Sequence, residues 1–261
     1  MKRLDKDAPD GAKRMVIAPR LKSKTGNFAI DEASGVALVS GFRDFIQTHN
    51  YPCVGAKSAL GRNQMTAYVG NSLTSAWDDV AIVRELISFA DEYRRDPAMF
   101  QTFVSLFPNT EELNETQFEK ALWERITSLQ DKDEWLGQAY DAKVSSDPSA
   151  PDFSLSFGGM SFFVVGMHPA ASRPARKFKV PVLVFNLHDQ FDRLRSEGRY
   201  EKLRASILQR DEKLAGSINP MLARHGERSE APQYSGRIVS REWECPWPGR
   251  QDTQVSDGDD G

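Results

Sequence analysis

The chain has 261 residues, of which 39% are hydrophobic and 27% are charged, and its formal net charge at pH 7 is -3. This length allows one large or two small domains with a substantial core, and the composition is that of an ordinary soluble globular protein. The charge balance lacks the basic excess of a nucleic-acid-binding protein, so nucleic acid is not expected as a partner.

Cysteine usage and apolar runs indicate the compartment. The two cysteines, Cys53 and Cys245, are too far apart in sequence for a CxxC metal motif, and two cysteines make no disulfide framework. No apolar stretch of the signal-peptide type follows the basic N-terminus, and no run approaches the ~20 apolar residues of a membrane span. We therefore expect a cytoplasmic protein with no membrane partner.

The first half of the chain is predicted to be helical after a polar start. Residues 1–30 are charged with scattered Pro and Gly, which predicts a loosely ordered arm. Apolar residues that recur at steps of three and four then predict three helices. These cover residues 36–49, 78–95 and 114–130. Asp78 is the expected N-cap of the second helix, and Asn114 and Gln117 have the spacing of a capping box.

Strands dominate after a linker rich in Ser, Asp and Pro at residues 145–151. Strands are predicted at residues 66–69, 153–157, 160–165 and 180–185. Gly158 and Gly159 predict a hairpin, because glycine supplies the positive backbone angles of a tight turn. The loop over residues 169–179 is too short for a helical crossover, so the strands on either side should pair antiparallel. The predicted fold class is α+β, with a mainly antiparallel central sheet flanked by helices.

The C-terminal third returns to a helical pattern. Residues 189–214 are predicted to be helical, with a break near residues 196–198 and Gly216 as the C-cap. Asp211 lies on the apolar face, where a carboxylate is costly to bury unless it meets a cation, so it pairs either with an arginine or with a substrate. Residues 251–261 are acidic and predicted to be disordered, which leaves a single domain over residues 31–250.

Two histidines stand at the ends of apolar strands. His168 follows the run over residues 162–166 and is stiffened by Pro169, and His188 follows the strand at residues 180–185. Strand ends that open onto loops often carry binding residues, because the scaffold behind them is rigid. A fixed imidazole at such a place suits a metal or haem pocket, and it also suits a hydrogen-bonded structural histidine.

Six separated blocks of the sequence resemble the YqcI/YcgG family and occur in the expected order between about residues 35 and 248. They are PCVGAK (52–57), GMHPAASRPAR (166–176), FNLHDQF (185–191), GSINP (216–220), SEAPQYSGR (229–237) and WECP (243–246). The family includes haem-dependent enzymes that N-hydroxylate guanidino groups, similar to those of the D-cycloserine and guanitoxin pathways, and many members without an assigned reaction. The resemblance therefore implies haem b as cofactor, O2, and a small guanidino or amino substrate.

The resemblance also implies an axial ligand for the haem iron. His168 is the first choice, and His188 would then be a distal or pocket-organising residue, with the reverse assignment open. Cys53 and Cys245 rank behind them, because neither lies in a loop that resembles the thiolate ligand loop of P450 enzymes. No nicotinamide or flavin fingerprint of the GxGxxG kind is visible, so an external reductase should supply the electrons.

Four cations are candidate partners for the haem propionates. Arg173 and Arg176 follow His168 within one short turn, and the arginine fork suits a carboxylate better than lysine does. Lys57 and Arg62 are secondary candidates for a propionate or for a substrate carboxylate. The alternative for each of the four is a solvated surface charge.

A guanidinium substrate needs a carboxylate partner, because burying that cation unpaired is prohibitive. Glu230 is the first choice for reading the substrate, and Asp211 is the second. Gln233, Tyr234 and Asn219 are candidates to hydrogen-bond the substrate or the oxygen, or to hold their own loops in place.

Three functions follow as alternatives. The first is a haem-dependent monooxygenase that N-hydroxylates a guanidino or amino group of a small amino-acid-like substrate. The second is a haem-binding sensor or carrier without turnover. The third is a haem-free enzyme built on Cys53, whose position beyond a predicted helix and near Lys57 would lower its pKa.

Overall fold

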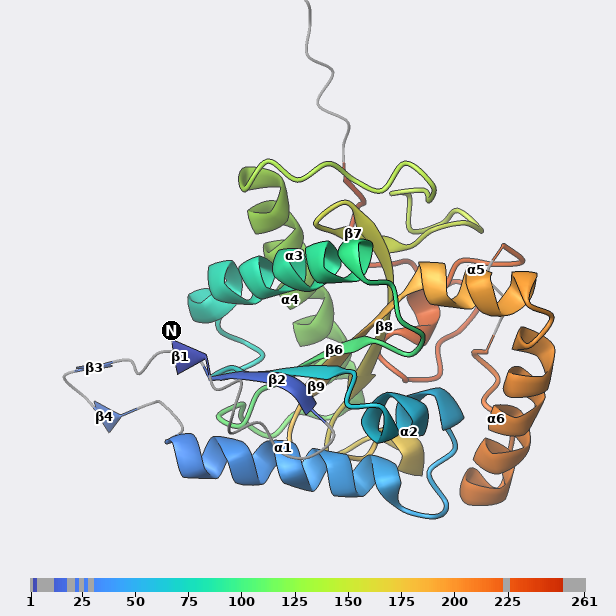
Figure 1. Cartoon of the computed structure of the whole chain (residues 1–261), viewed down its shortest axis with the longest axis horizontal. Coiled ribbons are helices and arrows are strands. Elements are labelled where there is room, and N and C mark those ends of the chain that lie inside the picture. Colours follow the sequence, from blue (N-terminus) through green and yellow to red (C-terminus); the bar gives the residue numbers. More distant parts are fainter. Residues whose placement is uncertain are drawn as a thin grey trace, which may run out of the picture.

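The computed structural model describes residues 2–3, 12–17, 22–23, 26–27, 31–222 and 226–250. Within these residues the fold is α+β, with helices packed on both faces of one large sheet (Figure 1). The acidic tail predicted to be disordered, residues 251–261, lies outside the described residues. None of the described helices has the length and apolar character needed to cross a bilayer.

The main sheet has seven strands in the described residues. Their order is β1 (Lys2–Arg3), β2 (Ala12–Ile17), β5 (Met65–Val69), β6 (Thr102–Leu106), β9 (Val182–Leu187), β8 (Met160–Met167) and β7 (Leu155–Phe157). A separate two-stranded pair joins β3 (Lys22–Ser23) to β4 (Gly26–Asn27).

This sheet is mixed, so the prediction of a mainly antiparallel sheet is wrong. Strands β2, β5 and β6 run parallel to one another, whereas β6, β9, β8 and β7 pair antiparallel. The parallel part was missed because neither β2 nor β6 was predicted as a strand. Part of the segment predicted as a loose arm, residues 12–17, forms β2, where Met15 and Val16 are fully buried.

Six α-helices and three one-turn helices surround the sheet in the described residues. They are α1 (Glu32–Gln47), α2 (Val54–Gly61), η1 (Ala76–Asp78), α3 (Asp79–Arg95), α4 (Glu115–Trp135), η2 (Pro174–Arg176), α5 (His188–Ser196), α6 (Tyr200–Ala215) and η3 (Ala231–Gln233). Helix α3 connects the parallel strands β5 and β6, which is the usual place of a crossover helix.

The local signals read from the sequence are largely confirmed. Asn114 and Gln117 form the capping box of α4, with two reciprocal hydrogen bonds of 2.9 Å. Gly158 and Gly159 make the β7–β8 turn at positive φ, and β8 pairs antiparallel with β9. Gly216 ends α6 with a φ of 74°. Asp78 stands at the N-cap of α3, but its side chain makes no capping bond there.

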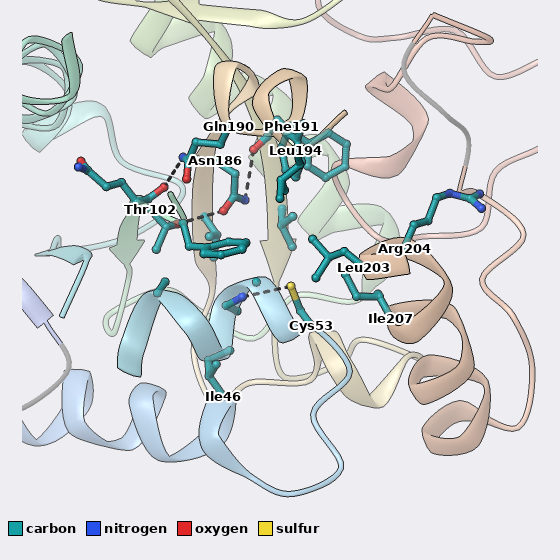
Figure 2. Close-up of a pocket in the computed structure, with 18 of the residues that line it drawn as sticks. Ile46, Cys53, Thr102, Asn186, Gln190, Phe191, Leu194, Leu203, Arg204 and Ile207 are labelled. Atoms are coloured by element: carbon teal, nitrogen blue, oxygen red, sulfur yellow. Dashed lines mark hydrogen bonds between the residues drawn. The ribbon is translucent and has the colours of Figure 1, made fainter. Parts of the chain in front are cut away.

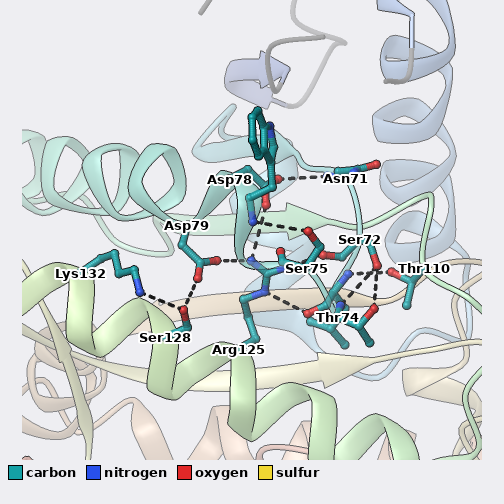
Figure 3. A network of polar contacts seen from close by, with 12 residues as sticks. Asn71, Ser72, Thr74, Ser75, Asp78, Asp79, Thr110, Arg125, Ser128 and Lys132 are labelled. Atoms are coloured by element: carbon teal, nitrogen blue, oxygen red, sulfur yellow. Dashed lines mark hydrogen bonds and ion pairs between the residues drawn. The ribbon is translucent and has the colours of Figure 1, made fainter. Parts of the chain in front are cut away.

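The side chain of Asp78 belongs instead to a buried polar network, which joins α3 to α4 (Figure 3). The Arg125 guanidinium, 3% exposed, pairs with Asp79 and lies 3.5 Å from a carboxylate oxygen of Asp78. It also donates to the carbonyls of Ser72, Leu73 and Ser75. A buried guanidinium needs such partners, because its charge has left water.

The two faces of the sheet carry separate cores. Phe162 and Val164 of β8 point to the face covered by α3 and α4. Val165 and Met167 point to the face covered by α1 and α2. This alternation follows from the two-residue period of a strand. The alternation of side chains between the two faces therefore decides which residues of β8 can reach the candidate site described below.

Candidate functional site

A cavity of about 300 Å³ lies on the α1 and α2 face of the sheet and is closed at the side by α5 and α6 (Figure 2). Its apolar wall includes Ile46, Phe163, Val165, Met167, Leu203 and Ile207. Its polar lining includes Thr102, Asn186, His188, Gln190, Glu230 and Gln233. An apolar wall with a few polar groups is typical of small-molecule sites, and the volume is at the lower end of their range of about 300–1,000 Å³.

A histidine and a carboxylate meet at the wall of this cavity. His188 is the first residue of α5, directly after β9, and its Nε2 lies 3.1 Å from Oε1 and 3.0 Å from Oε2 of Glu230. The hydroxyl of Tyr234 donates to Oε1 of the same carboxylate. The residues His188, Glu230 and Tyr234 are 4%, 2% and 0% exposed. Burial and the charge of Glu230 raise the pKa of Tyr234 well above its ordinary value, so the phenol keeps its proton.

Neutral polar groups extend the site along the sheet. Thr102 Oγ1 lies 3.2 Å from Asn186 Oδ1, and Gln190 Nε2 donates to the carbonyl of Gln101 at 2.7 Å. Sequence reasoning missed this row. A signal was present, because Asn186 and Gln190 flank His188 in the FNLHDQF block.

His168, the predicted axial ligand, lies on the other face of the sheet from the cavity. It follows the last residue of β8, so its side chain continues the series of Phe162 and Val164 rather than that of Val165. Its ring stacks on Phe118 of α4, with the ring centroids 4.1 Å apart. Burial lowers the pKa of His168 to about 4. The structure therefore does not bring His168 together with His188.

The two arginines predicted to bind propionates are engaged elsewhere. Arg173 pairs with Asp211 at 2.5 Å and donates to the carbonyl of Ser217 at 2.8 Å. The arginine pairing considered for Asp211 is thus confirmed. Arg176 donates to the carbonyls of Gly166, Gln233 and Tyr234, and burial lowers its pKa to about 10. Arg176 therefore supports the loop behind Glu230 rather than facing the cavity.

The secondary candidates have local roles. Lys57 donates to two backbone carbonyls just after the end of α1, at 2.6 and 3.1 Å. Arg62 stacks over Phe100, 5.6 Å from the ring centre, and Phe100 lines the cavity. Asn219 accepts a hydrogen bond from the backbone of Met221 at 3.0 Å and thereby holds its own loop.

Cys53 lines the cavity at the start of α2, where its Sγ accepts from the backbone N–H of Ala56 at 3.4 Å. Burial raises the pKa of the Cys53 thiol. The expectation of a lowered pKa is therefore wrong, because desolvation of the thiolate outweighs the hydrogen bonds at the helix start. Cys245 is half-buried, and desolvation raises its pKa to about 12.

Fold and site together define an α+β protein with a buried histidine–carboxylate pair at the wall of an apolar cavity. Among the described residues, no three His, Cys, Asp or Glu side chains gather as a site for a metal ion. The sequence profile of the YqcI/YcgG family matches residues 42–248, and the chain belongs to this family. Searches of curated proteins and of solved structures found no significant match.

Proposed function

We propose that the cavity binds haem b through His188 and that the protein N-hydroxylates a small guanidino or amino compound. When bound, the haem iron supplies the activation of O2 that hydroxylation of an unactivated nitrogen needs. The observation that carries the proposal is the His188–Glu230 pair. A histidine that ligates a metal usually donates its other ring N–H to a carboxylate, which fixes the ring and raises its basicity.

The side chains that line the cavity suit a haem, but the cavity is too small to admit one unless one of its walls moves. A haem is larger than the cavity of about 300 Å³, so its uptake must displace part of the lining. Helix α6 is the wall that packs most loosely, because Asp211 is the only buried residue of this helix. Leu203 and Ile207 are half-buried over the cavity and would then pack on the macrocycle. Arg195 and Arg204, which also line the cavity, are the cations placed to meet the propionates.

The lining favours a cationic substrate. Glu230 is the only carboxylate among the described residues that line the cavity. A buried anion in an apolar wall is stabilised by a cation, so a guanidinium or ammonium group that reaches Glu230 beside His188 would make a charge-assisted hydrogen bond to it. The O2 comes from solution and the electrons from an external reductase.

Turnover of a guanidino panel, with L-arginine first, tests the proposal. Haem-reconstituted protein is incubated with each compound and either O2 and a reductant or peroxide as a surrogate oxidant. We expect a product heavier by an oxygen atom, and we expect Glu230→Gln to lose it and also to shift the haem spectrum, because Glu230 contacts the proposed ligand His188. Glu244→Gln is the matched control, because Glu244 is exposed and outside the cavity. Haem binding without turnover or spectral response would favour a sensor or carrier.

A haem-free small-molecule site is the second candidate. The volume favours it, because about 300 Å³ holds a small molecule without any movement of α6. A purified protein that takes up no haem but is stabilised by a guanidino compound would support this function over the first.

A further inference from the structure

We infer that Asn186 determines the specificity of the cavity by selecting ligands that carry an accepting oxygen a short spacer away from their cationic group. This inference rests on the part of the proposed function that places a guanidino or amino group beside Glu230, and it involves no haem. The carboxylate of Glu230 binds the cation. The amide of Asn186 donates a hydrogen bond to an ether, carbonyl or carboxylate oxygen of the same molecule.

The place of Asn186 in the sheet turns its side chain toward the cavity. Strand β9 lies inside the sheet between β6 and β8, and Asn186 is the only half-buried residue of this strand. It pairs in register with Thr102 on one side and with Phe163 on the other, and all three residues line the cavity. Figure 2 shows the amide of Asn186 on the cavity side of the sheet, beside Thr102. The exposed area of Asn186 therefore faces the cavity.

The amide nitrogen of Asn186 has a donor to spare. Its oxygen, Oδ1, lies 3.2 Å from the hydroxyl of Thr102, which donates to it. Among the described residues, its nitrogen, Nδ2, meets only the carbonyl of Phe163, at 3.5 Å. This distance is longer than the about 2.7–3.2 Å of an ordinary N–H···O bond. An oxygen in place of Nδ2 would face that carbonyl, so this orientation of the amide is the favourable one. At least one of the two N–H groups is thus available to a ligand.

The apolar surroundings make this spare donor selective. The neighbours of Asn186 in the cavity wall include Phe163, Val165 and Val184, none of which has a polar side chain. A ligand that covers the amide with CH2 groups removes water from the N–H and gives no acceptor in return, which is costly. A ligand with an oxygen at that place keeps the N–H hydrogen-bonded. By contrast, Gln190 in the same row already makes an ordinary bond of 2.7 Å to the carbonyl of Gln101.

One small molecule can reach both Asn186 and Glu230. Asn186 and His188 are two residues apart along the chain and both line the cavity. Residues with this separation in extended chain are about 6–7 Å apart. The Nε2 of His188 lies 3.0 Å from Oε2 of Glu230, so the carboxylate stands directly beyond the histidine. The expected ligand therefore carries its cation and its accepting oxygen on a spacer of a few atoms.

The test compares two series of ligands by isothermal titration calorimetry on the purified full-length protein. The first series is alkylguanidines of increasing length, and the second is the methoxyalkylguanidines of the same lengths, in which an oxygen replaces one CH2 group. We expect the best methoxy compound to bind the wild type at least as tightly as its alkyl counterpart. In Asn186→Leu, the ratio of the two dissociation constants should shift by about tenfold against the methoxy compound, because its oxygen is then buried without a donor.

Three further variants separate specificity from packing. Thr102→Val removes the hydroxyl that orients the amide and should shift the ratio in the same direction by a smaller factor, so it tests the inference even if Asn186→Leu fails to fold. Val184→Leu is the matched control, because it changes the volume of the same wall without a polar group and should leave the ratio unchanged. Glu230→Gln should weaken both series alike.

The outcomes distinguish this inference from the proposed function. A ratio that is the same in the wild type, Asn186→Leu and Thr102→Val would overturn the role of Asn186 while leaving the cationic ligand of Glu230 intact. Wild-type protein that binds no guanidine of either series would contradict the proposed cationic ligand and this inference together.

Discussion

Asp211→Ala is predicted to destabilise the protein strongly, because it leaves the Arg173 guanidinium buried without its carboxylate. Arg173 is 7% exposed and Asp211 is 6% exposed, so neither charge can return to water without movement of α6. Breaking a buried pair in this way costs about 3–5 kcal/mol of unfolding free energy. At about 2–4 °C per kcal/mol, the melting temperature should fall by roughly 6–20 °C. Urea unfolding followed by circular dichroism measures the effect.

Two controls isolate the cause of the destabilisation by Asp211→Ala. Asp192→Ala removes an exposed pair with Arg195, in which the Asp192 side chain is 65% exposed, and should cost at most about 1 kcal/mol. The double variant Arg173→Met with Asp211→Leu should recover most of the loss, because it removes both charges. It still lacks the hydrogen bond to the Ser217 carbonyl, worth about 1 kcal/mol. Equal stability of Asp211→Ala and Asp192→Ala would refute the reasoning.

Three further predictions concern other buried groups. Burial lowers the pKa of His168 to about 4, below the ~6.5 of an unfolded chain. The free energy of unfolding should therefore fall as the pH falls from about 6.5 toward 4. Urea titrations at several pH values should show that His168→Gln removes the part of this fall that comes from protonation of His168. Gly166→Ala should cost about 1–3 kcal/mol, because its Cβ would lie 2.6 Å from a side-chain carbon of α4. The helical control Gly61→Ala meets nothing within 4 Å and should be neutral or stabilising. Arg125→Met should cost about 3–5 kcal/mol in the same unfolding assay, whereas Lys120→Met, at an exposed pair, should cost under ~1 kcal/mol.

Local signals in the sequence predicted much of the fold. The capping box of Asn114 and Gln117, the turn at Gly158 and Gly159 and the helix end at Gly216 each depend on a few neighbouring residues. Such features need no knowledge of distant contacts. For the same reason the antiparallel pairing of β8 and β9 followed from the short connection between them.

The parallel strands depend on distant contacts and were missed. Strand β2 lies in a charged segment, and its buried Arg14 is compensated by ion pairs with Glu85 and Glu92 of α3. Strand β6 has the sequence TFVSL and is fully buried, including Ser105, so it lacks the alternation of a half-exposed strand. Parallel strands are usually buried on both faces, and short runs of this kind are hard to distinguish from helix or loop.

The candidate site was predicted in part. His188, Glu230 and Gln233 were all named from the sequence and line one cavity, with Tyr234 behind Glu230. His168 was ranked above His188 because Pro169 stiffens the chain after it and Arg173 and Arg176 follow it closely. The sequence does not show which face of the sheet carries the cavity. That choice depends on where α1, α2 and α6 pack, which is a property of the whole fold.

The ligation of haem tests the account most directly. Purified protein is reconstituted with haem b, and the Soret absorption of His188→Ala is compared with that of His168→Ala. We predict that His188→Ala abolishes the band or changes its ligation, whereas His168→Ala, on the opposite face of the sheet, keeps the wild-type spectrum at pH 7. A normal spectrum in His188→Ala together with loss of the band in a folded His168→Ala variant would contradict the account.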